Sequence, residues 1–482
     1  NNRTHLQMKI KFLPLIAGIF TTATIMTSCL GNDLDDIKLG SESSITAFSI
    51  GTVWVPVTGV DQNGNDSVYL DSIDCSGYPF TIDQLNRRIE NKDSLPVGAD
   101  VSRVLTSLTS DGSVWYTKRS DAGIENDTVW SSQDSIDFTY PVTFKVYAYS
   151  GVQGTPYTVR VNVHKQVPDS LQWLNYQQTF ADGVSLQRQK AVAIDGKVYV
   201  FGVRNGETVA QYTTVSTGNP SAWQTVALPA GTDSYSAVVW KDAVWFLASN
   251  QLYQLNPGDN TYSLVANAPS LTQLVAATDE SNGGQKTILY ARNADNRFVR
   301  LENETWTEDE EETLGAFAAG QRLSAASMPL SYNKTLVRTI LMGNNEGTAP
   351  SDTTSLLFSR ISNEQSWARY AQNNPLTCPN LENISMIHYD DKLYAFGGKA
   401  TTGEGEVAPF ERFYCSIDNG LTWDPVSRSV TFPEDGSFRA FYESSHGNYS
   451  CTVDSEHFIW IIWENGALSR GRINRLGFAP KW

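Results

Sequence analysis

The stretch that decides the fold is S-I-D-N-G-L-T-W, which runs from Ser416 to Trp423. Asp418 and Asn419 are residues whose side chains bond nearby backbone amides, and Gly420 accepts a positive φ without steric cost. The two residues that follow, Thr422 and Trp423, favour an extended strand with an aromatic anchor. The stretch therefore predicts a tight turn between two antiparallel strands.

Strand patterns like the one around this turn repeat six times between about residue 170 and Trp482. Each repeat contains a β-rich aliphatic run, and these runs are Val198–Gly202, Val244–Leu247, Thr287–Tyr290, Val337–Gly343, Leu393–Gly398 and Phe458–Trp463. A strand of small residues precedes each run, and an alternating strand follows it. The outermost strands open with an aromatic residue, at Trp223, Tyr262, Trp306, Trp367 and Trp423.

That last series lacks one member, and the segment Leu171–Tyr176 ahead of the first repeat supplies it. A ring of sheets must close to remove its open edges, and an N-terminal strand that completes the last sheet does so. The spacing of Ser416, Asp418, Gly420, Thr422 and Trp423 resembles the Asp-box of sialidases and other β-propellers, and Gly397-Gly398 resembles the kelch double glycine. The resemblance implies a propeller and no particular reaction. We predict an all-β chain: an Ig-like β-sandwich, then a six-bladed β-propeller closed by Leu171–Tyr176.

The N-terminal region has the pattern of an export signal. Basic residues precede an apolar run, Phe12–Met26, and Thr27-Ser28-Cys29 follows it. This ending resembles a bacterial lipobox, which implies that Cys29 is lipidated, although an ordinary signal peptide remains an alternative. We assign residues 1–29 to upstream residues and signal peptide and 30–43 to an acidic tether. The tether resembles the export signal of Bacteroidota surface lipoproteins, so we expect outer-membrane anchoring, with the cell surface favoured over the periplasmic face.

Residues 44–166 predict a separate β-sandwich, and 167–482 the propeller. Strand patterns occur at Ile45–Ile50, Ser67–Leu70, Ser113–Tyr116, Val142–Tyr147 and Tyr157–Val163. Ile82–Ile89 has the spacing of one short amphipathic helix. The whole chain resembles an uncharacterised family of Bacteroidota lipoproteins with an Ig-like N-terminal domain and an Asp-box or kelch-like propeller. The resemblance carries no known activity.

The charge composition limits the kinds of molecule that the protein is expected to bind. The chain has 52 acidic and 36 basic residues and a formal charge of −16, which argues against nucleic acid as a partner. Export permits disulfides among Cys75, Cys378, Cys415 and Cys451, but none has a C-x-x-C spacing, and the position of Cys415 and Cys451 inside predicted strands favours buried free thiols.

No catalytic constellation is evident, and we expect neither cofactor nor metal. A sialidase needs three arginines around its site, and Arg188, Arg322 and Arg439 are the candidates. Other glycoside hydrolases need a pair of carboxylates at a set separation, and the sequence pairs none. The run Glu308–Glu312 is interpreted as solvated surface, with calcium binding as an alternative. We do not assign any catalytic residue.

The position of residues in the propeller gives the remaining prediction. Loops that lead into the innermost strands converge at the axial mouth, where propellers bind ligands. The residues that this register places there are Arg188, Lys190, Tyr235, Gln273, Arg322, Glu382, Asn383, His446 and Tyr449. We expect a non-catalytic lipoprotein that binds a glycan or cell-surface protein there, with an exported glycoside hydrolase as the alternative.

Overall fold

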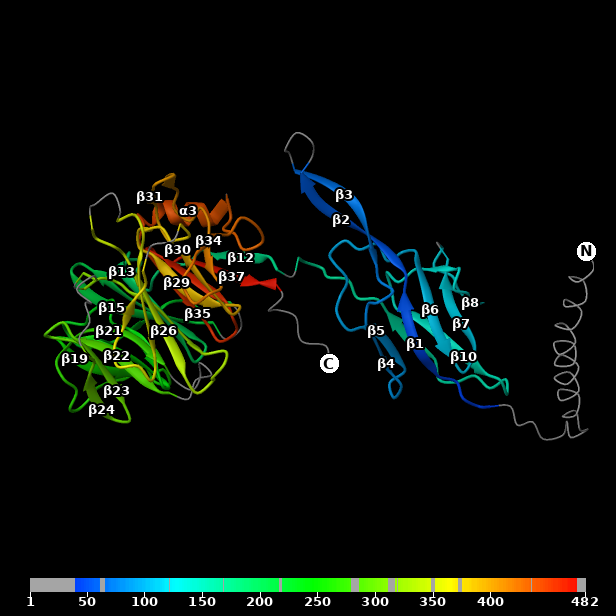
Figure 1. Ribbon diagram of the computed structural model, residues 1–482, viewed down its shortest axis with the longest axis horizontal. Coiled ribbons are helices and arrows are strands. Elements are labelled where there is room, and N and C mark those ends of the chain that lie inside the picture. The colour runs from blue at the N-terminus through cyan, green and yellow to red at the C-terminus, as the bar shows by residue number, and fades with distance from the viewer. Residues whose placement is uncertain are drawn as a thin grey trace, which may run out of the picture. The chain divides into compact units, whose positions relative to one another are not determined.

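The computed structural model describes residues 40–60, 66–120, 122–167, 169–215, 219–278, 286–310, 317–318, 320–347, 352–371, 375–434 and 436–474. The predicted signal peptide, Cys29 and most of the tether lie outside these residues. The described chain falls into two compact units that divide between Lys165 and Gln166. Almost all regular structure is β-strand (Figure 1). No helix among the described residues is long and apolar enough to cross a membrane.

The N-terminal unit consists of two sheets and a hairpin. Its strands are β1 (Ile45–Ile50), β2 (Thr52–Val60), β3 (Asp66–Asp74), β4 (Phe80–Asp83), β5 (Arg88–Asn91), β6 (Val104–Ser110), β7 (Gly112–Arg119), β8 (Glu125–Val129), β9 (Ser135–Ile136), β10 (Val142–Ala148) and β11 (Tyr157–Arg160). One sheet has the order β1-β6-β9, and the other has the order β4-β5-β11-β10-β7-β8. Strand β10 alternates between buried and half-buried residues, and Phe48, Tyr116 and Phe144 contribute to the core.

The helix predicted for Ile82–Ile89 is wrong, because this segment is the hairpin between β4 and β5. Ile82 pairs with Ile89 across the two strands. The Asp83 carboxylate accepts hydrogen bonds from the amides of Leu85 and Asn86, at 3.1 and 2.9 Å, and Arg87 has a φ of 50°. The Asp83 side chain thus stabilises a tight turn, and pairing with β11 then fixes the strand state.

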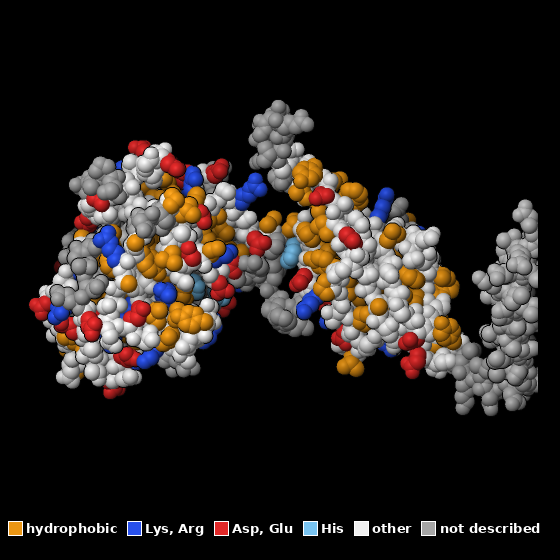
Figure 2. Space-filling view, viewed as in Figure 1, with side chains coloured by type: hydrophobic (Ala, Val, Ile, Leu, Met, Phe, Trp, Pro, Cys, Tyr) orange, Lys and Arg blue, Asp and Glu red, His pale blue; other side chains and the backbone are white. Residues whose placement is uncertain are grey.

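The β2–β3 hairpin forms a two-stranded sheet of its own. Trp54, Val68, Tyr69 and Leu70 are exposed along it, and Figure 2 shows hydrophobic side chains on this ribbon. Val53 and Val55, by contrast, are buried in the core of the unit. The ribbon therefore has one face inside the unit and apolar side chains outside it.

The C-terminal unit contains, in its described part, six four-stranded antiparallel sheets. The first strands are β13 (Gln187–Ile194), β17 (Val238–Trp240), β21 (Leu271–Thr278), β25 (Ser324–Pro329), β29 (Ser385–Tyr389) and β35 (Tyr449–Val453). The second strands are β14 (Lys197–Arg204), β18 (Ala243–Ala248), β22 (Ile288–Asn293), β26 (Val337–Gly343), β30 (Lys392–Phe396) and β36 (Ile459–Trp463). The third strands are β15 (Glu207–Thr214), β19 (Gln251–Leu255), β23 (Phe298–Glu302), β27 (Leu356–Ile361), β33 (Tyr414–Ser416) and β37 (Leu468–Ile473).

The fourth strands are β16 (Gln224–Val226), β20 (Tyr262–Leu264), β24 (Thr305–Glu308), β28 (Ala368–Arg369), β34 (Asp424–Pro425) and β12 (Leu171–Tyr176). The first strands contact one another in a cycle, β13-β17-β21-β25-β29-β35 and back to β13. Small residues occur in these strands because six strands crowd around one axis.

Strand β12 comes from the start of this unit but pairs with the last strand of the chain. Leu171 lies opposite Ile473, and Tyr176 lies opposite Leu468. The Trp173 ring stacks on Phe432 at 5.6 Å between centroids, and its Nε1 donates to the Thr431 carbonyl at 2.9 Å. This pairing joins the two ends of the unit and leaves β37 no open edge.

The Ser416–Trp423 stretch forms the turn between β33 and β34, as its residues predict. The Asp418 carboxylate accepts from the Thr422 amide at 2.9 Å, from the Thr422 hydroxyl at 2.6 Å and from the Ser416 hydroxyl at 2.8 Å. Gly420 has a φ of 89°, and Trp423 is buried beneath the turn. Burial opposes ionisation of Asp418, but the bonds from Thr422 and Ser416 outweigh it and lower the pKa of the carboxyl.

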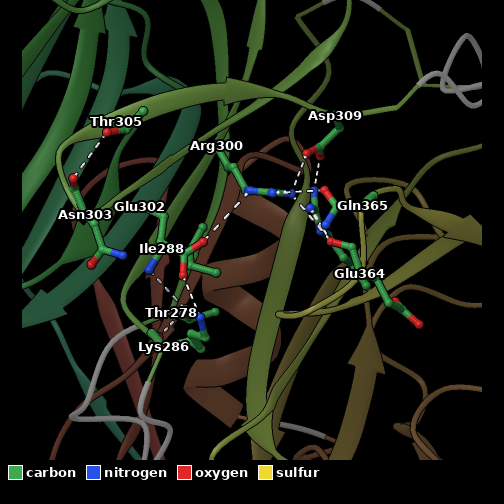
Figure 3. Close-up of polar contacts among 11 residues, drawn as sticks. Thr278, Lys286, Ile288, Arg300, Glu302, Asn303, Thr305, Asp309, Glu364 and Gln365 are labelled. Atoms are coloured by element: carbon green, nitrogen blue, oxygen red, sulfur yellow. Dashed lines mark hydrogen bonds and ion pairs between the residues drawn. The ribbon is translucent and has the colours of Figure 1, made fainter.

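In the acidic run, Glu308 and Glu310 are exposed as interpreted, but Asp309 is not. Glu308 pairs with exposed Arg297, whereas Asp309 is buried between two arginines. Figure 3 shows Arg300 directed at the Asp309 carboxylate, with Nη1 to Oδ1 at 3.1 Å. Arg360, which is fully buried, binds the other oxygen. The Asp309 amide donates to the Phe298 carbonyl at 2.9 Å, which extends the pairing of β23 and β24 by one residue. Residues 311 and 312 lie outside the described part.

The described cysteines are free thiols. Cys75 and Cys378 are buried, and Cys415 and Cys451 are partly buried. Burial raises the pKa of the Cys378 and Cys451 thiols to about 12.

Candidate functional site

The axial mouth is the end of the ring at which the chain enters the first strands. The only helix in the described part, α3 (Gly436–Ser444), lies just ahead of β35 at this end. A hairpin of β31 (Ala400–Thr402) and β32 (Gly405–Val407) follows β30, so it lies beside the start of β29, and Figure 1 draws β31 and α3 together. Arg439 of α3 binds the segment that follows this hairpin, because its Nη atoms donate to the Pro409 and Phe410 carbonyls, each at 2.8 Å. The mouth thus has a wall on one side.

Arg322 links four sheets across the axis. It precedes β25, and its Nη1 donates to the Tyr449 carbonyl at 2.8 Å and to the Gln189 carbonyl at 3.4 Å. Its Nη2 donates to the Asn383 carbonyl. The guanidinium also lies over the Tyr449 ring, 5.1 Å from the centroid. These bonds fix the positive charge at the centre of the ring and leave it little freedom to bind a ligand directly.

Arg188 approaches the mouth from the opposite side. Strand β13 has a bulge between Gln187 and Lys190, and Arg188 within it has a φ of 47°, a left-handed conformation that costs energy for a residue with a Cβ. Its guanidinium lies 4.3 Å from the Tyr235 centroid, and Nη2 donates to the Gly320 carbonyl at 3.3 Å. Arg188 is exposed. The bulge therefore places an accessible guanidinium on an aromatic ring of the neighbouring sheet.

Lys190 is the second cation of this group. It is half-buried on β13, and its ammonium makes no hydrogen bond or ion pair with any residue that the structure describes. Burial lowers the pKa of Lys190 to about 8; the Asp233 carboxylate opposes this shift, and the Arg322 guanidinium adds to it. A charge held without a partner costs stability, which is typical of a residue that serves binding.

Asn383 and Tyr449 lie beside Arg322. The Tyr449 hydroxyl donates to the Asn383 carbonyl at 2.6 Å, and burial raises the pKa of Tyr449 to about 12. The Asn383 amide donates to the Gly447 carbonyl at 2.9 Å. Both residues thus join the loops that lead into β29 and β35, and these hydrogen bonds engage the Tyr449 hydroxyl and the Asn383 amide.

The other predicted residues, Gln273, Glu382 and His446, make no hydrogen bond or ion pair with Arg188, Lys190 or Arg322. Gln273 is buried and donates to the Gln321 carbonyl at 2.8 Å. Glu382 is exposed, with Lys399 Nζ 3.7 Å from its carboxylate. The His446 ring is 78% exposed, and its Nδ1 lies 3.0 Å from a carboxylate oxygen of Glu464.

Sequence reasoning missed two participants. Gln189 is buried and accepts from the Ser450 hydroxyl at 3.0 Å. Asp233 faces Lys190, and its carboxylate accepts from the Tyr235 amide at 3.0 Å. Arg439, which was a candidate for an arginine triad, instead donates to the Pro409 and Phe410 carbonyls and belongs to the wall. The available signal was a polar residue within two positions of a predicted mouth residue: Gln189 is adjacent to Arg188 and Lys190, and Asp233 is two positions before Tyr235.

In the part of the chain that the structure describes, no three histidine, cysteine, aspartate or glutamate side chains gather as a metal site would require.

The fold of the C-terminal unit is that of a β-propeller protein. The model of the DUF6242 beta propeller domain matches residues 167–481, and that of the DUF6242 N-terminal domain matches residues 48–161. The chain belongs to the DUF6242 family. Comparison with curated protein sequences finds no match.

Solved structures give distant likenesses. An auxiliary nutrient binding protein from Bacteroides ovatus is 10% identical with a TM-score of 0.39, over 77% of this chain and 94% of that one. A Penicillium chrysogenum alpha-L-arabinanase complexed with arabinobiose is 10% identical with a TM-score of 0.35, over 63% and 97%. The Aleuria aurantia lectin in complex with alpha-methyl-L-fucoside is 12% identical with a TM-score of 0.34, over 61% and 92%. These likenesses are too distant to carry a functional argument.

Proposed function

We propose that the protein is a non-catalytic binding protein that takes a glycan at the axial mouth of its propeller. The observation that carries the proposal is the Arg188–Tyr235 pair, an exposed guanidinium that lies over an aromatic ring, 4.3 Å from its centroid, two residues from Lys190, whose ammonium makes no hydrogen bond with a described residue. Rigid aromatic and cationic groups with free donors are what a site needs to orient sugar hydroxyls.

A binding role is favoured over hydrolysis because three carboxylates around the mouth, those of Asp233, Glu382 and Glu464, already have partners. Asp233 accepts from the Tyr235 amide, Glu382 pairs with Lys399 and Glu464 lies against His446. A glycoside hydrolase needs one carboxylic acid and one carboxylate directed at the same bond. A cell-surface protein as the ligand is the other outcome of the test below.

A glycan array with the purified full chain tests this proposal. We expect wild-type protein to bind a limited set of glycans, and Arg188→Ala to lose that binding. Lys241→Ala is the matched control, because Lys241 also lies over an aromatic ring, 4.4 Å from the Trp240 centroid, but follows β17 at the other end of the ring. Release of reducing sugar from the bound glycans would contradict the non-catalytic role. Failure to bind any glycan would contradict glycan binding.

The finer architecture also belongs to this proposal. We infer that the six sheets are six blades closed by β12, that residues 44–166 are an Ig-like spacer, and that residue 167 begins the propeller. We further propose that Cys29 is acylated and holds the protein on the outer membrane, with the cell surface favoured. Metabolic labelling with a palmitate analogue should mark wild type but not Cys29→Ala, and protease added to intact cells should remove the surface protein. Label retained by Cys29→Ala would contradict the anchor.

A further inference from the structure

The centre of the mouth is positively charged on an acidic protein. Arg188, Lys190 and Arg322 meet there, and Asp233 is the acid that faces Lys190, whereas the whole chain has a formal charge of −16. We propose that the mouth selects acidic saccharides, which bind by a carboxylate or sulfate group to Arg188 and Lys190. This inference rests on the proposed function and names its ligand class.

Arg188 supplies the directional part of the site. A guanidinium has five N–H donors in a planar fork that matches two oxygens of a carboxylate or sulfate. Only one of these donors is engaged within the described residues, in the 3.3 Å bond from Nη2 to the Gly320 carbonyl. The guanidinium carbon lies over the Tyr235 ring, 4.3 Å from its centroid, and this contact restricts the orientation of the fork. Arg188 therefore presents an oriented set of donors with little rotamer entropy left to lose.

Lys190 and Arg322 supply the charge. The Lys190 ammonium has three donors and no hydrogen-bonding partner among the described residues. Arg322 donates to the carbonyls of Gln189, Asn383 and Tyr449, so it acts as a fixed positive charge near Lys190. The positive charges of Lys190 and Arg322 repel one another in a partly buried mouth. An anion bound to Lys190 and Arg188 would offset that repulsion.

A neutral sugar would leave this repulsion in place. It could accept hydrogen bonds from Arg188 and Lys190, but it would bring no charge to offset theirs. An acidic sugar adds charge-assisted bonds, which are shorter and stronger than neutral ones. Selectivity is thus expected to depend on salt, because ions screen partly exposed charges.

The test is titration calorimetry of the full chain at pH 7 with matched oligosaccharides. The ligands are an oligogalacturonate, its carboxyl-reduced oligogalactose form and a sulfated form of that oligogalactose. We expect at least one charged form to bind tenfold or more tighter than the neutral form, and the two charged arms distinguish carboxylate from sulfate. Arg188→Ala and Lys190→Met should each remove this preference, and Lys241→Ala should keep it. Thermal melts of each variant establish that it is folded.

Arg188→Lys is a second variant that keeps the charge but removes the fork. We expect it to bind the charged form more weakly than wild type and more tightly than Arg188→Ala. Equal binding of neutral and charged forms would overturn the acidic preference and leave glycan binding standing. A glycan array on which only neutral glycans bind, again through Arg188, would overturn it in the same way. No binding to any glycan would overturn the proposed function as well.

Discussion

Arg322 and Tyr449 are joined twice: the Arg322 guanidinium lies 5.1 Å from the Tyr449 ring centroid, and its Nη1 donates to the Tyr449 carbonyl at 2.8 Å. The two residues belong to sheets that are not neighbours in the ring, β25 and β35. The ring is therefore held at its centre as well as around its circumference.

Arg322→Met should destabilise the propeller, because the carbonyls of Gln189, Asn383 and Tyr449 each lose the donor that Arg322 supplies. We expect a loss of about 2–4 kcal/mol in the free energy of unfolding, measured by urea titration with tryptophan fluorescence. Arg322→Lys should restore little, because one ammonium cannot reach the carbonyls that the guanidinium spans. The exposed Arg369→Ala is the control, with an expected change below about 0.5 kcal/mol. An Arg322→Met protein as stable as wild type would contradict the role of this residue.

Asp418→Ala should weaken the turn between β33 and β34 by about 1–3 kcal/mol, because Thr422 and Ser416 lose their acceptor. The pKa of Asp418 is lowered in the folded protein from its ordinary value of 3.8. Its contribution is therefore complete above that value and is lost as the pH falls through the lower folded pKa. Wild type and Asp418→Ala should differ at pH 7 and converge at the lowest pH at which both fold. A constant difference between the two proteins across this range would contradict the assignment.

The sequence predicted much of the propeller because each of its strands has a local signal. The turn at Ser416–Trp423 is one short segment, and five of the outer strands each open with their own aromatic residue. Local propensity and spacing are therefore enough to predict them. The segment Ile82–Ile89 failed for the opposite reason. Its spacing suits a helix, but Asp83 makes a turn and β11 provides a partner strand from far along the chain.

The candidate site was predictable only as a set of positions. Counting strands brought Arg188, Lys190 and Arg322 to one end of the ring, but no local pattern distinguishes an engaged guanidinium from a free one. Whether Arg322 binds carbonyls depends on residues 61 to 133 positions away. The burial of Asp309 between Arg300 and Arg360 likewise could not be predicted, because a run of acidic residues is typical of exposed surface.

Asp309→Ala should be strongly destabilising, because it leaves the fully buried Arg360 without its carboxylate. Removing one partner of a buried pair typically costs about 3–5 kcal/mol. Glu308→Ala removes the neighbouring carboxylate, whose pair with Arg297 is exposed, and should cost less than about 1 kcal/mol. Thermal denaturation of the two variants side by side compares these costs. Equal melting temperatures for both would contradict the buried arrangement.

Lys190→Met should stabilise the protein although it removes binding. The folded pKa of about 8 lies below the ordinary lysine value, so folding disfavours the charged form. The charged Lys190 side chain therefore lowers the free energy of unfolding by its full amount below pH 8, and this loss disappears as the pH rises towards the unfolded pKa. At pH 7 we expect a gain of up to about 3 kcal/mol. Denaturant titrations at pH 7 and pH 10 measure it, and a less stable Lys190→Met protein at pH 7 would contradict the penalty assigned to this ammonium.

The pH dependence of oligogalacturonate binding tests the central claim most directly, because it ties the ligand to Lys190. Asp233 and Arg322 are the charged groups that act on this ammonium. With a pKa of about 8 in the free protein, the affinity should be constant below pH 7 and fall towards tenfold per pH unit above pH 8. Lys190→Met should bind more weakly and show no such fall. A wild-type affinity that does not change between pH 6 and pH 10, or a Lys190→Met protein with the wild-type profile, would contradict the account.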